Sequence, residues 1–371
     1  MSVPVIKGAT GLDVVAAIPY CLGYQPAASL VGVALMPPRG RLGATWRADS
    51  EGLRDPEAGP DLAHNLAAVM VQQDAQGVFL VRYATADEPS ADQDKGLRLA
   101  LAALRQTCPV EALWDYWGGI LRELDPRTLQ PIGDVHAPDE LKGTRVMASH
   151  AALGTPPPMR CRAALAEFPE VDKEAQRRAA RAERRAIDRF AASDDAARVG
   201  WRLKSLKLWR TWLNRLAAAP SAPVDPVVLG KLGAALHDQP TRDAVIAAQM
   251  RRSRTWPERL AKGLIGCPPV LDPLESDGFE PRYGDASDAL FRQVIAHQAP
   301  KRRAAALGTF ATVKWWRGDG SAAGELAEAA LDCPNPPAIA ALALASVQAL
   351  IFPQTLKAKA AAARRSVARA A

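Results

Sequence analysis

Apolar and polar residues alternate over the first 140 residues in short blocks that predict strands and helices. The run from Ser29 to Met36 is almost entirely apolar and has the length of a strand buried on both faces. Residues 111–124 form two short runs around Gly118-Gly119, which indicates a hairpin with a two-residue turn, and a loop follows it. This order predicts a mixed sheet covered by helices. Further strands are expected at 42–48 and 77–83, and helices at 11–18 (ending near Pro19), 61–71, 92–106 and 146–153.

Helical periodicity dominates the rest of the chain, where strand patterns disappear. The predicted fold class is therefore an α/β N-terminal domain followed by an all-α C-terminal domain. We expect an α/β domain at 1–168, a basic helical region at 169–265, a Pro-, Gly- and Asp-rich connector at 266–286, and helical hairpins with a basic tail at 287–371. The predicted helices are 172–192, 194–218, 225–237, 241–252, 287–298, 300–316, 321–332 and 338–351.

A distinctive block precedes the first strand: Pro19, Leu22-Gly23-Tyr24, Pro26 and Ser29-Leu30-Val31. Together with Leu236-His237-Asp238, Arg242-Asp243 and Trp316-Arg317-Gly318-Asp319-Gly320, it resembles the actinobacterial family described as domain of unknown function 4192. The resemblance covers most of the chain; it supports the two-part architecture and implies no activity. Many members carry Cys-Cys-Pro and then Gly where this chain reads PIGDVHAPDELKGT, so no role of that cysteine pair is carried over.

The composition fits a folded protein with an excess of positive charge. Apolar residues make up 48% of the 371 residues and charged residues 23%, which is typical of globular domains. The N-terminus lacks the pattern of a secretory signal, and no run approaches the roughly 18 apolar residues of a membrane span. The five cysteines are scattered and form no CxxC motif, so we expect reduced thiols in a cytoplasmic protein.

The positive charge is concentrated at the start of the helical half. The net charge of the chain is +7 and its pI is about 9.3. A cationic helix face can neutralise nucleic-acid phosphates or contact a partner protein; alternatively, it is a solvated face with Glu/Arg pairs, which is the commoner case. The candidate contact residues are Arg177, Arg178, Arg181, Arg184, Arg185, Lys204, Lys207 and Arg210.

Two helical segments allow a structural and a functional interpretation. Residues 201–216 form an apolar stripe flanked by cations, which is more typical of a core helix than of a helix that binds a membrane or a partner's groove. Residues 300–334 resemble one tetratricopeptide-like hairpin, with Ala322 and Ala329 where the helices cross. A single hairpin is weak support for a peptide-binding array, because such arrays need about three units. The RGD at 317–319 is interpreted as turn chemistry.

Motifs for catalysis are sparse. The sequence contains no HExxH, GxSxG, Walker-type or Rossmann-type glycine motif, and no cofactor is expected. His136 lies near Asp134, Asp139 and Glu140, and His150 follows, but irregular spacing makes a metal or proton-transfer site an unfavoured interpretation.

Two hypotheses about function remain open after the sequence. The favoured one is a non-enzymatic binding or scaffold protein that contacts a partner protein or nucleic acid through the basic helical half. The alternative is a small-molecule-binding protein or enzyme with a pocket at the strand ends of the α/β domain.

Overall fold

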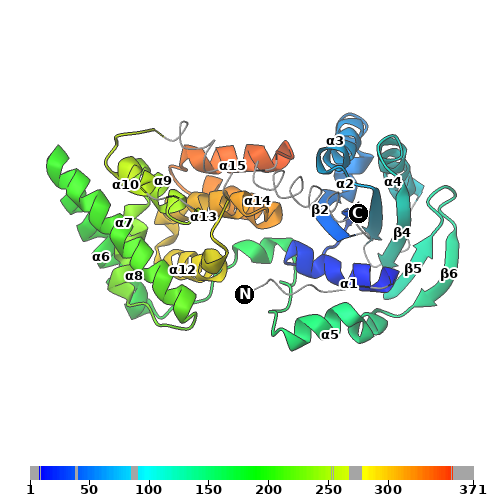
Figure 1. Ribbon diagram of the computed structural model, residues 1–371, viewed down its shortest axis with the longest axis horizontal. Coiled ribbons are helices and arrows are strands. Elements are labelled where there is room, and N and C mark those ends of the chain that lie inside the picture. The colour runs from blue at the N-terminus through cyan, green and yellow to red at the C-terminus, as the bar shows by residue number, and fades with distance from the viewer. Residues whose placement is uncertain are drawn as a thin grey trace, which may run out of the picture. The chain divides into compact units, whose positions relative to one another are not determined.

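The computed structural model describes residues 8, 10–37, 41–84, 91–251, 253, 255–266, 278–351 and 353, without the side chains of 91–93. These residues form two compact units, which divide between Leu165 and Ala166 (Figure 1). Unit 1 contains the sheet and unit 2 is helical. The predicted fold class, an α/β part followed by an all-α part, is confirmed.

Unit 1 is built on one six-stranded mixed sheet with the order β2-β1-β3-β4-β5-β6. Only the pairing of β3 with β4 is parallel among these six strands; the other neighbours are antiparallel. β1 and β3 lie inside the sheet and are buried along their length, as their continuous apolar runs predict. The strands are β1 (Ser29–Met36), β2 (Arg41–Asp49), β3 (Gly77–Tyr83), β4 (Val110–Trp117), β5 (Ile120–Leu124) and β6 (Pro131–His136).

The predicted hairpin is formed by β4 and β5. Gly118 and Gly119 have φ values of 53° and 78°, the left-handed conformation that a tight two-residue turn needs at both positions. β6 was predicted as a loop, and that prediction is wrong. All residues of β6 except His136 are exposed, so no buried apolar face marks this edge strand in the sequence. Pro131 and Gly133, whose φ is 71°, weaken the strand pattern further, and the register of the pairing shifts between Arg122 and Glu123.

Helices cover both faces of the sheet, with α1 and α5 on one side and α2, α3 and α4 on the other (Figure 1). The prediction that α1 ends near Pro19 is wrong, because the helix runs through this residue and ends at Gly23, where φ is 80°. Proline removes one N–H donor, and here that loss does not break the last turn. The helices are α1 (Gly11–Leu22), α2 (Ser50–Arg54), α3 (Ala58–Gln73), α4 (Ala91–Leu104) and α5 (Arg145–Ala152), with 3₁₀ turns at Pro138–Gly143 and Arg162–Ala166.

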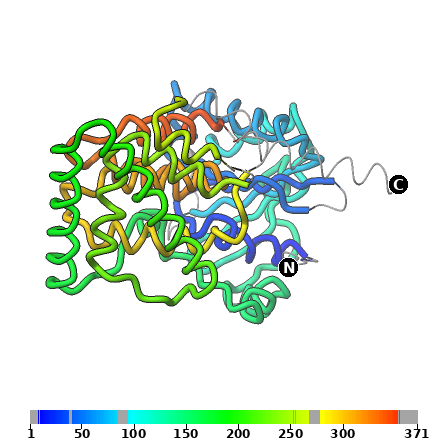
Figure 2. Tube along the Cα trace, turned by 60° about the vertical axis from the view of Figure 1, so that its left-hand side comes forward, coloured from blue at the N-terminus to red at the C-terminus, as the bar shows by residue number. Residues whose placement is uncertain are grey.

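Unit 2 is a packed set of helices (Figure 2). Its core contains a row of aromatic rings. The rings of Trp209 and Phe291 lie 4.9 Å apart and those of Phe291 and Phe310 5.1 Å apart, and all three side chains are fully buried. Its helices are α6 (Lys173–Ala191), α7 (Asp195–Ala218), α8 (Pro226–Ala235), α9 (Gln239–Ala247), α10 (Trp256–Ala261), α12 (Gly284–His297), α13 (Ala304–Trp316), α14 (Gly320–Leu331) and α15 (Ala338–Gln348), with 3₁₀ turns at Pro281–Tyr283 and Pro300–Arg302.

The helical half differs from the predicted pattern at a few places. α10 was not predicted, because its six residues are too short to show a helical period. α12 begins at Gly284, inside the range predicted as a connector, whereas residues 267–277 of that range and the tail after 353 lie outside the described residues. α13 and α14 form a helical hairpin, and its likeness to a tetratricopeptide unit stays a prediction. Across the described chain, every helix is too short or too polar to span a membrane.

Candidate anion-binding groove

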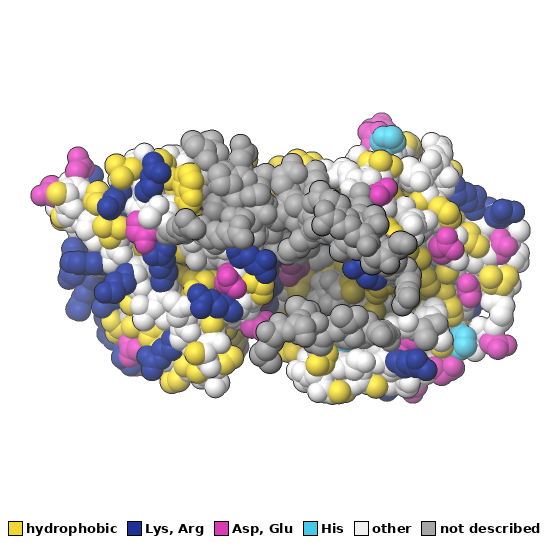
Figure 3. Space-filling view, in the orientation of Figure 1, with side chains coloured by type: hydrophobic (Ala, Val, Ile, Leu, Met, Phe, Trp, Pro, Cys, Tyr) yellow, Lys and Arg dark blue, Asp and Glu magenta, His cyan; other side chains and the backbone are white. Residues whose placement is uncertain are grey.

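The arginine-rich segment forms α6, a helix with one buried and one cationic side. Asp172 caps its N-terminus by accepting a hydrogen bond of 2.9 Å from the N–H of Ala175. The helix buries Ala179 and Glu183, whereas its arginines lie on the exposed side. Figure 3 shows Lys and Arg side chains gathered over this part of unit 2.

The carboxylate of Glu183 is on the buried side of α6 and is 1% exposed. Its Oε1 accepts a 2.7 Å hydrogen bond from the side chain of Gln298 and lies 3.2 Å from Nε2 of His237. These contacts join α6 to residues from two other parts of unit 2. Glu183 therefore holds the helix in place, and it is directed away from the arginines on the exposed side.

Gly230 allows α8 to pack closely against α6. A Cβ atom built at this position would lie 2.1 Å from the backbone oxygen of Ala179 and 3.0 Å from the Cβ of Ala182. Glycine is thus required by the close approach of the two backbones. This approach places Lys231, the next residue of α8, beside the arginines of α6.

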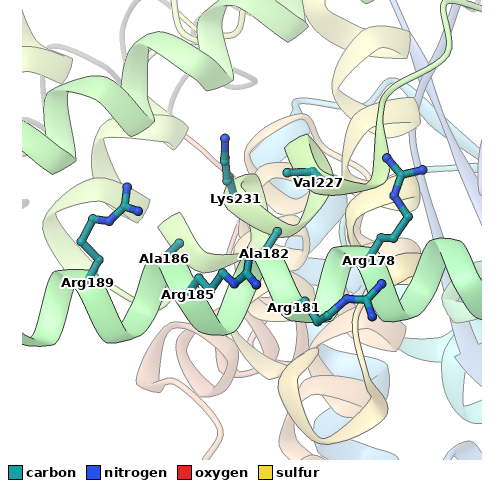
Figure 4. A pocket seen from close by; sticks show the side chains of 8 residues that line it. All are labelled: Arg178, Arg181, Ala182, Arg185, Ala186, Arg189, Val227 and Lys231. Carbon is teal, nitrogen blue, oxygen red and sulfur yellow. The ribbon is translucent and has the colours of Figure 1, made fainter.

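α6 and α8 enclose a groove of about 420 Å³ (Figure 4). The cations belong to two different helices and surround a floor of small apolar side chains. No acidic side chain is part of the lining. The groove is lined by Arg178, Arg181, Ala182, Arg185, Ala186, Arg189, Val227 and Lys231.

Of the five cations that line the groove, two are paired with a carboxylate among the described residues. Arg178 pairs with Asp225 at 2.9 Å and Arg181 with Glu174 at 2.8 Å, and all four side chains are about half exposed. Arg185, Arg189 and Lys231 form no ion pair within the described part of the chain. One end of the groove therefore presents three uncompensated cations, which an anion could contact without displacing a carboxylate.

The remaining predicted contact residues are not brought into this groove. Arg177 lies 3.9 Å from Glu174 on α6, and Arg184 is exposed on the same helix. Arg210 of α7 is paired with Glu258 of α10 and, with Lys207, lines a separate recess of about 320 Å³. Lys204 is exposed on α7.

Sequence reasoning did not select two of the groove's cations, Arg189 and Lys231. Arg189 follows Arg185 by four residues, so the helical period could have placed it on the same stripe as Arg181. Lys231 gives no such signal, because it comes from a different helix and reaches the groove only through the packing at Gly230.

The amphipathic segment at 201–216 forms most of α7, and its apolar stripe lies in the core of unit 2, as the core interpretation predicts. Trp209, Leu213 and Leu216 are fully buried. The indole N–H of Trp209 donates to the backbone oxygen of Leu232 at 3.2 Å. This apolar face is therefore used within unit 2 and is not free to contact a membrane or partner.

The histidine and carboxylate groups of unit 1 are dispersed among separate contacts. Nδ1 of His136 lies 2.9 Å from a carboxylate oxygen of Glu140, whereas Asp139 pairs with Lys142 at 2.7 Å. His150 stacks on Tyr20, with ring centroids 3.7 Å apart, and burial lowers the pKa of its imidazole. The described residues contain no group of three or more such side chains arranged for a metal.

A buried ion-pair cluster lies near the carboxyl ends of β3 and β4. The guanidinium of Arg82 donates two hydrogen bonds of 2.6 and 2.7 Å to Asp115 and a third of 2.6 Å to Asp94. Burial opposes the charge of Arg82, yet the two carboxylates raise its pKa above the ordinary value. The cluster joins β3, β4 and α4, and its donors are satisfied internally.

Nearly the whole chain matches a known protein family. A model described as "Domain of unknown function (DUF4192)" matches residues 12–354. The chain belongs to this family. The DUF4192 match includes parts of both units and confirms the resemblance noted in the sequence. No curated protein and no solved structure matches the chain.

Several residues that carry the DUF4192 resemblance hold helix ends in place. Gly23 ends α1, and Asp319 caps α14 by accepting from the N–H of Ala322 at 3.1 Å. Asp238 caps α9 and also accepts two hydrogen bonds of 2.9 Å from Arg202 of α7. Gly318 and Asp319 of the RGD sequence lie in the turn between α13 and α14. These roles are structural.

Proposed function

We propose that this protein is a non-enzymatic nucleic-acid-binding protein that holds backbone phosphates in the groove between α6 and α8. The observation that carries the proposal is the convergence of Arg185, Arg189 and Lys231, from two helices, without an ion-pair partner among the described residues. Arginine guanidinium groups match phosphate oxygens well, because their donors form a planar fork.

The spacing along α6 supports a linear polyanion as the ligand. Arg181, Arg185 and Arg189 recur every four residues, which corresponds to about 6 Å of rise per step. This step is comparable with the separation of successive phosphates along a polynucleotide. Contacts of this kind position a strand without identifying its bases, so we expect little sequence preference.

The remaining ion pairs of the groove do not oppose such binding strongly. The pairs made by Arg178 and Arg181 are half exposed, and solvent-exposed ion pairs of this type contribute little to stability. A phosphate could therefore replace Asp225 or Glu174. The cytoplasmic location forms part of the proposal; the four described cysteines are free thiols, and Cys267 lies outside the described residues.

Binding of labelled single- and double-stranded DNA and RNA of random sequence would test the proposal by fluorescence anisotropy. If three phosphates are neutralised, a plot of log K against log salt should have a slope of about −2 to −3. The double variant Arg185→Glu and Arg189→Glu should lose at least about tenfold in affinity at low salt.

A matched control separates the groove from the net charge. Arg127→Glu and Lys142→Glu change the charge by the same amount at exposed positions of unit 1 and should leave binding nearly unchanged. An equal loss in both double variants, or no binding at low salt, would refute the proposal. Selective capture of an acidic protein through the groove, without nucleic-acid binding, would support a partner-protein function instead.

A further inference from the structure

Unit 2 contains a second groove, of about 430 Å³, with walls of mainly apolar side chains. It lies among α9, α10, α13 and α15, and its lining shares no residue with the cationic groove. Its volume falls within the range of small-molecule sites. The main apolar side chains are Ile246, Met250, Leu260, Trp315, Ile339 and Leu342.

The apolar groove extends from buried side chains at its base to an exposed side chain at its rim. Leu260 and Met250 are 3% and 4% exposed and form the inner surface. Leu342 of α15 is 67% exposed, although it is a large apolar side chain beside Trp315 and Ile339 in the same lining. An apolar ligand in the groove would cover this side chain and remove its surface from water.

The only charged side chains in the lining are Arg242 and Asp243 of α9. They are 13% and 10% exposed, and Nε of Arg242 donates to Asp243 at 3.2 Å. This hydrogen bond fixes the guanidinium through Nε, the nitrogen nearest the aliphatic part of the side chain. Its two terminal nitrogens have no acceptor among the residues that the structure describes, so they can donate to a ligand.

We propose that the apolar groove binds a small carboxylate with an aliphatic chain, of the size of a medium-chain fatty acid. The chain would contact the apolar walls, and the carboxylate would accept hydrogen bonds from the terminal nitrogens of Arg242. A planar guanidinium fixed at one side is suited to such a two-point contact. The proposal is independent of nucleic-acid binding, because the two grooves use different residues.

Calorimetric titration of the full chain with octanoate, below the concentration at which micelles form, tests this site. 1-Octanol and octylamine serve as ligands of equal chain length without the carboxylate. We expect saturable binding of octanoate, at least about tenfold tighter than that of 1-octanol, since the hydroxyl of the alcohol is a single uncharged acceptor for Arg242, whereas the carboxylate accepts two charge-assisted hydrogen bonds. Octylamine should bind more weakly than octanoate, because its ammonium group cannot accept the hydrogen bonds that Arg242 donates.

Two substitutions separate the charged contact from the apolar walls. Arg242→Gln should remove the preference for octanoate over 1-octanol, and Arg242→Lys should retain part of it. Leu342→Gln should weaken both ligands alike, whereas Ala345→Gln, an exposed residue of α15 outside the lining, should change neither. Leu342 is exposed, so its substitution leaves the core intact even if Arg242 variants fold poorly.

Three results would overturn the proposal: no saturable binding of octanoate, equal affinity for octanoate and 1-octanol, or equal effects of Leu342→Gln and Ala345→Gln. Circular dichroism of each variant establishes that it is folded before titration. Loss of nucleic-acid binding in the variants of α6 would have no bearing on these outcomes.

Discussion

At the scale of single residues, the absence of one side chain determines where a cationic surface forms. Gly230 has no Cβ, so α8 can lie against the backbone of α6 at Ala179. Any larger residue would force the two helices apart or displace a carbonyl oxygen. The position of Lys231 beside Arg185 depends on this contact.

The first prediction at this scale concerns Gly230→Ala. The new Cβ would meet the oxygen of Ala179, so we expect a loss of about 1–3 kcal/mol in the free energy of unfolding, measured with urea. Gly200→Ala, inside α7, is the matched control, since a Cβ built there would meet nothing within 4 Å apart from adjacent residues and the backbone of its own helix. This control should gain about 0.5–1 kcal/mol; a similar gain in Gly230→Ala would contradict the packing argument.

A second prediction concerns the buried ion pair of unit 1. Asp115→Asn leaves the guanidinium of Arg82 poorly compensated in the core, so the free energy of unfolding should fall by about 3–5 kcal/mol. Lys142→Ala breaks a pair of nearly the same length, 2.7 Å, whose side chains are 77% and 84% exposed. That control should change the free energy of unfolding far less than Asp115→Asn does, and equal effects would show that burial is not the deciding factor.

At the scale of elements, α6 combines an anchoring side with a binding side. Glu183 and Ala179 face the core, and the cationic stripe faces the groove. The acidic residues Glu174 and Asp225 occupy only the end of the groove nearest Arg178 and Arg181. They act as internal competitors for any anion that extends along the whole helix.

This competition leads to a prediction for Glu174→Gln with Asp225→Asn. The double variant frees two arginines, so nucleic acid should bind more tightly and the salt slope should steepen by up to about 2. Asparagine can still cap α8, where Asp225 accepts from the N–H of Val227 at 2.7 Å. Asp134→Asn with Asp139→Asn gives the same charge change at exposed positions of unit 1, and a comparable gain there would contradict the competition.

At the scale of the whole molecule, patterns within one segment were predictable and contacts between segments were not. The burial of β1 and the turn at Gly118-Gly119 depend on neighbouring residues, so the sequence is sufficient for them. β6 depends on pairing with β5, and its exposed residues carry no apolar pattern that would reveal this pairing. The candidate groove follows the same rule: the stripe on α6 is visible in the sequence, whereas Lys231 joins it only through tertiary packing.

The packing of α8 on α6 also has a consequence for synthesis. The ribosome completes the arginine stripe of α6 first, then all of α7, and only afterwards the segment that contains Lys231. Once α6 has left the ribosome and α8 has not, the cationic helix is exposed without its second wall. The groove is therefore assembled late in translation, and early contacts of the emerging arginines with ribosomal RNA would lack the geometry of the finished protein.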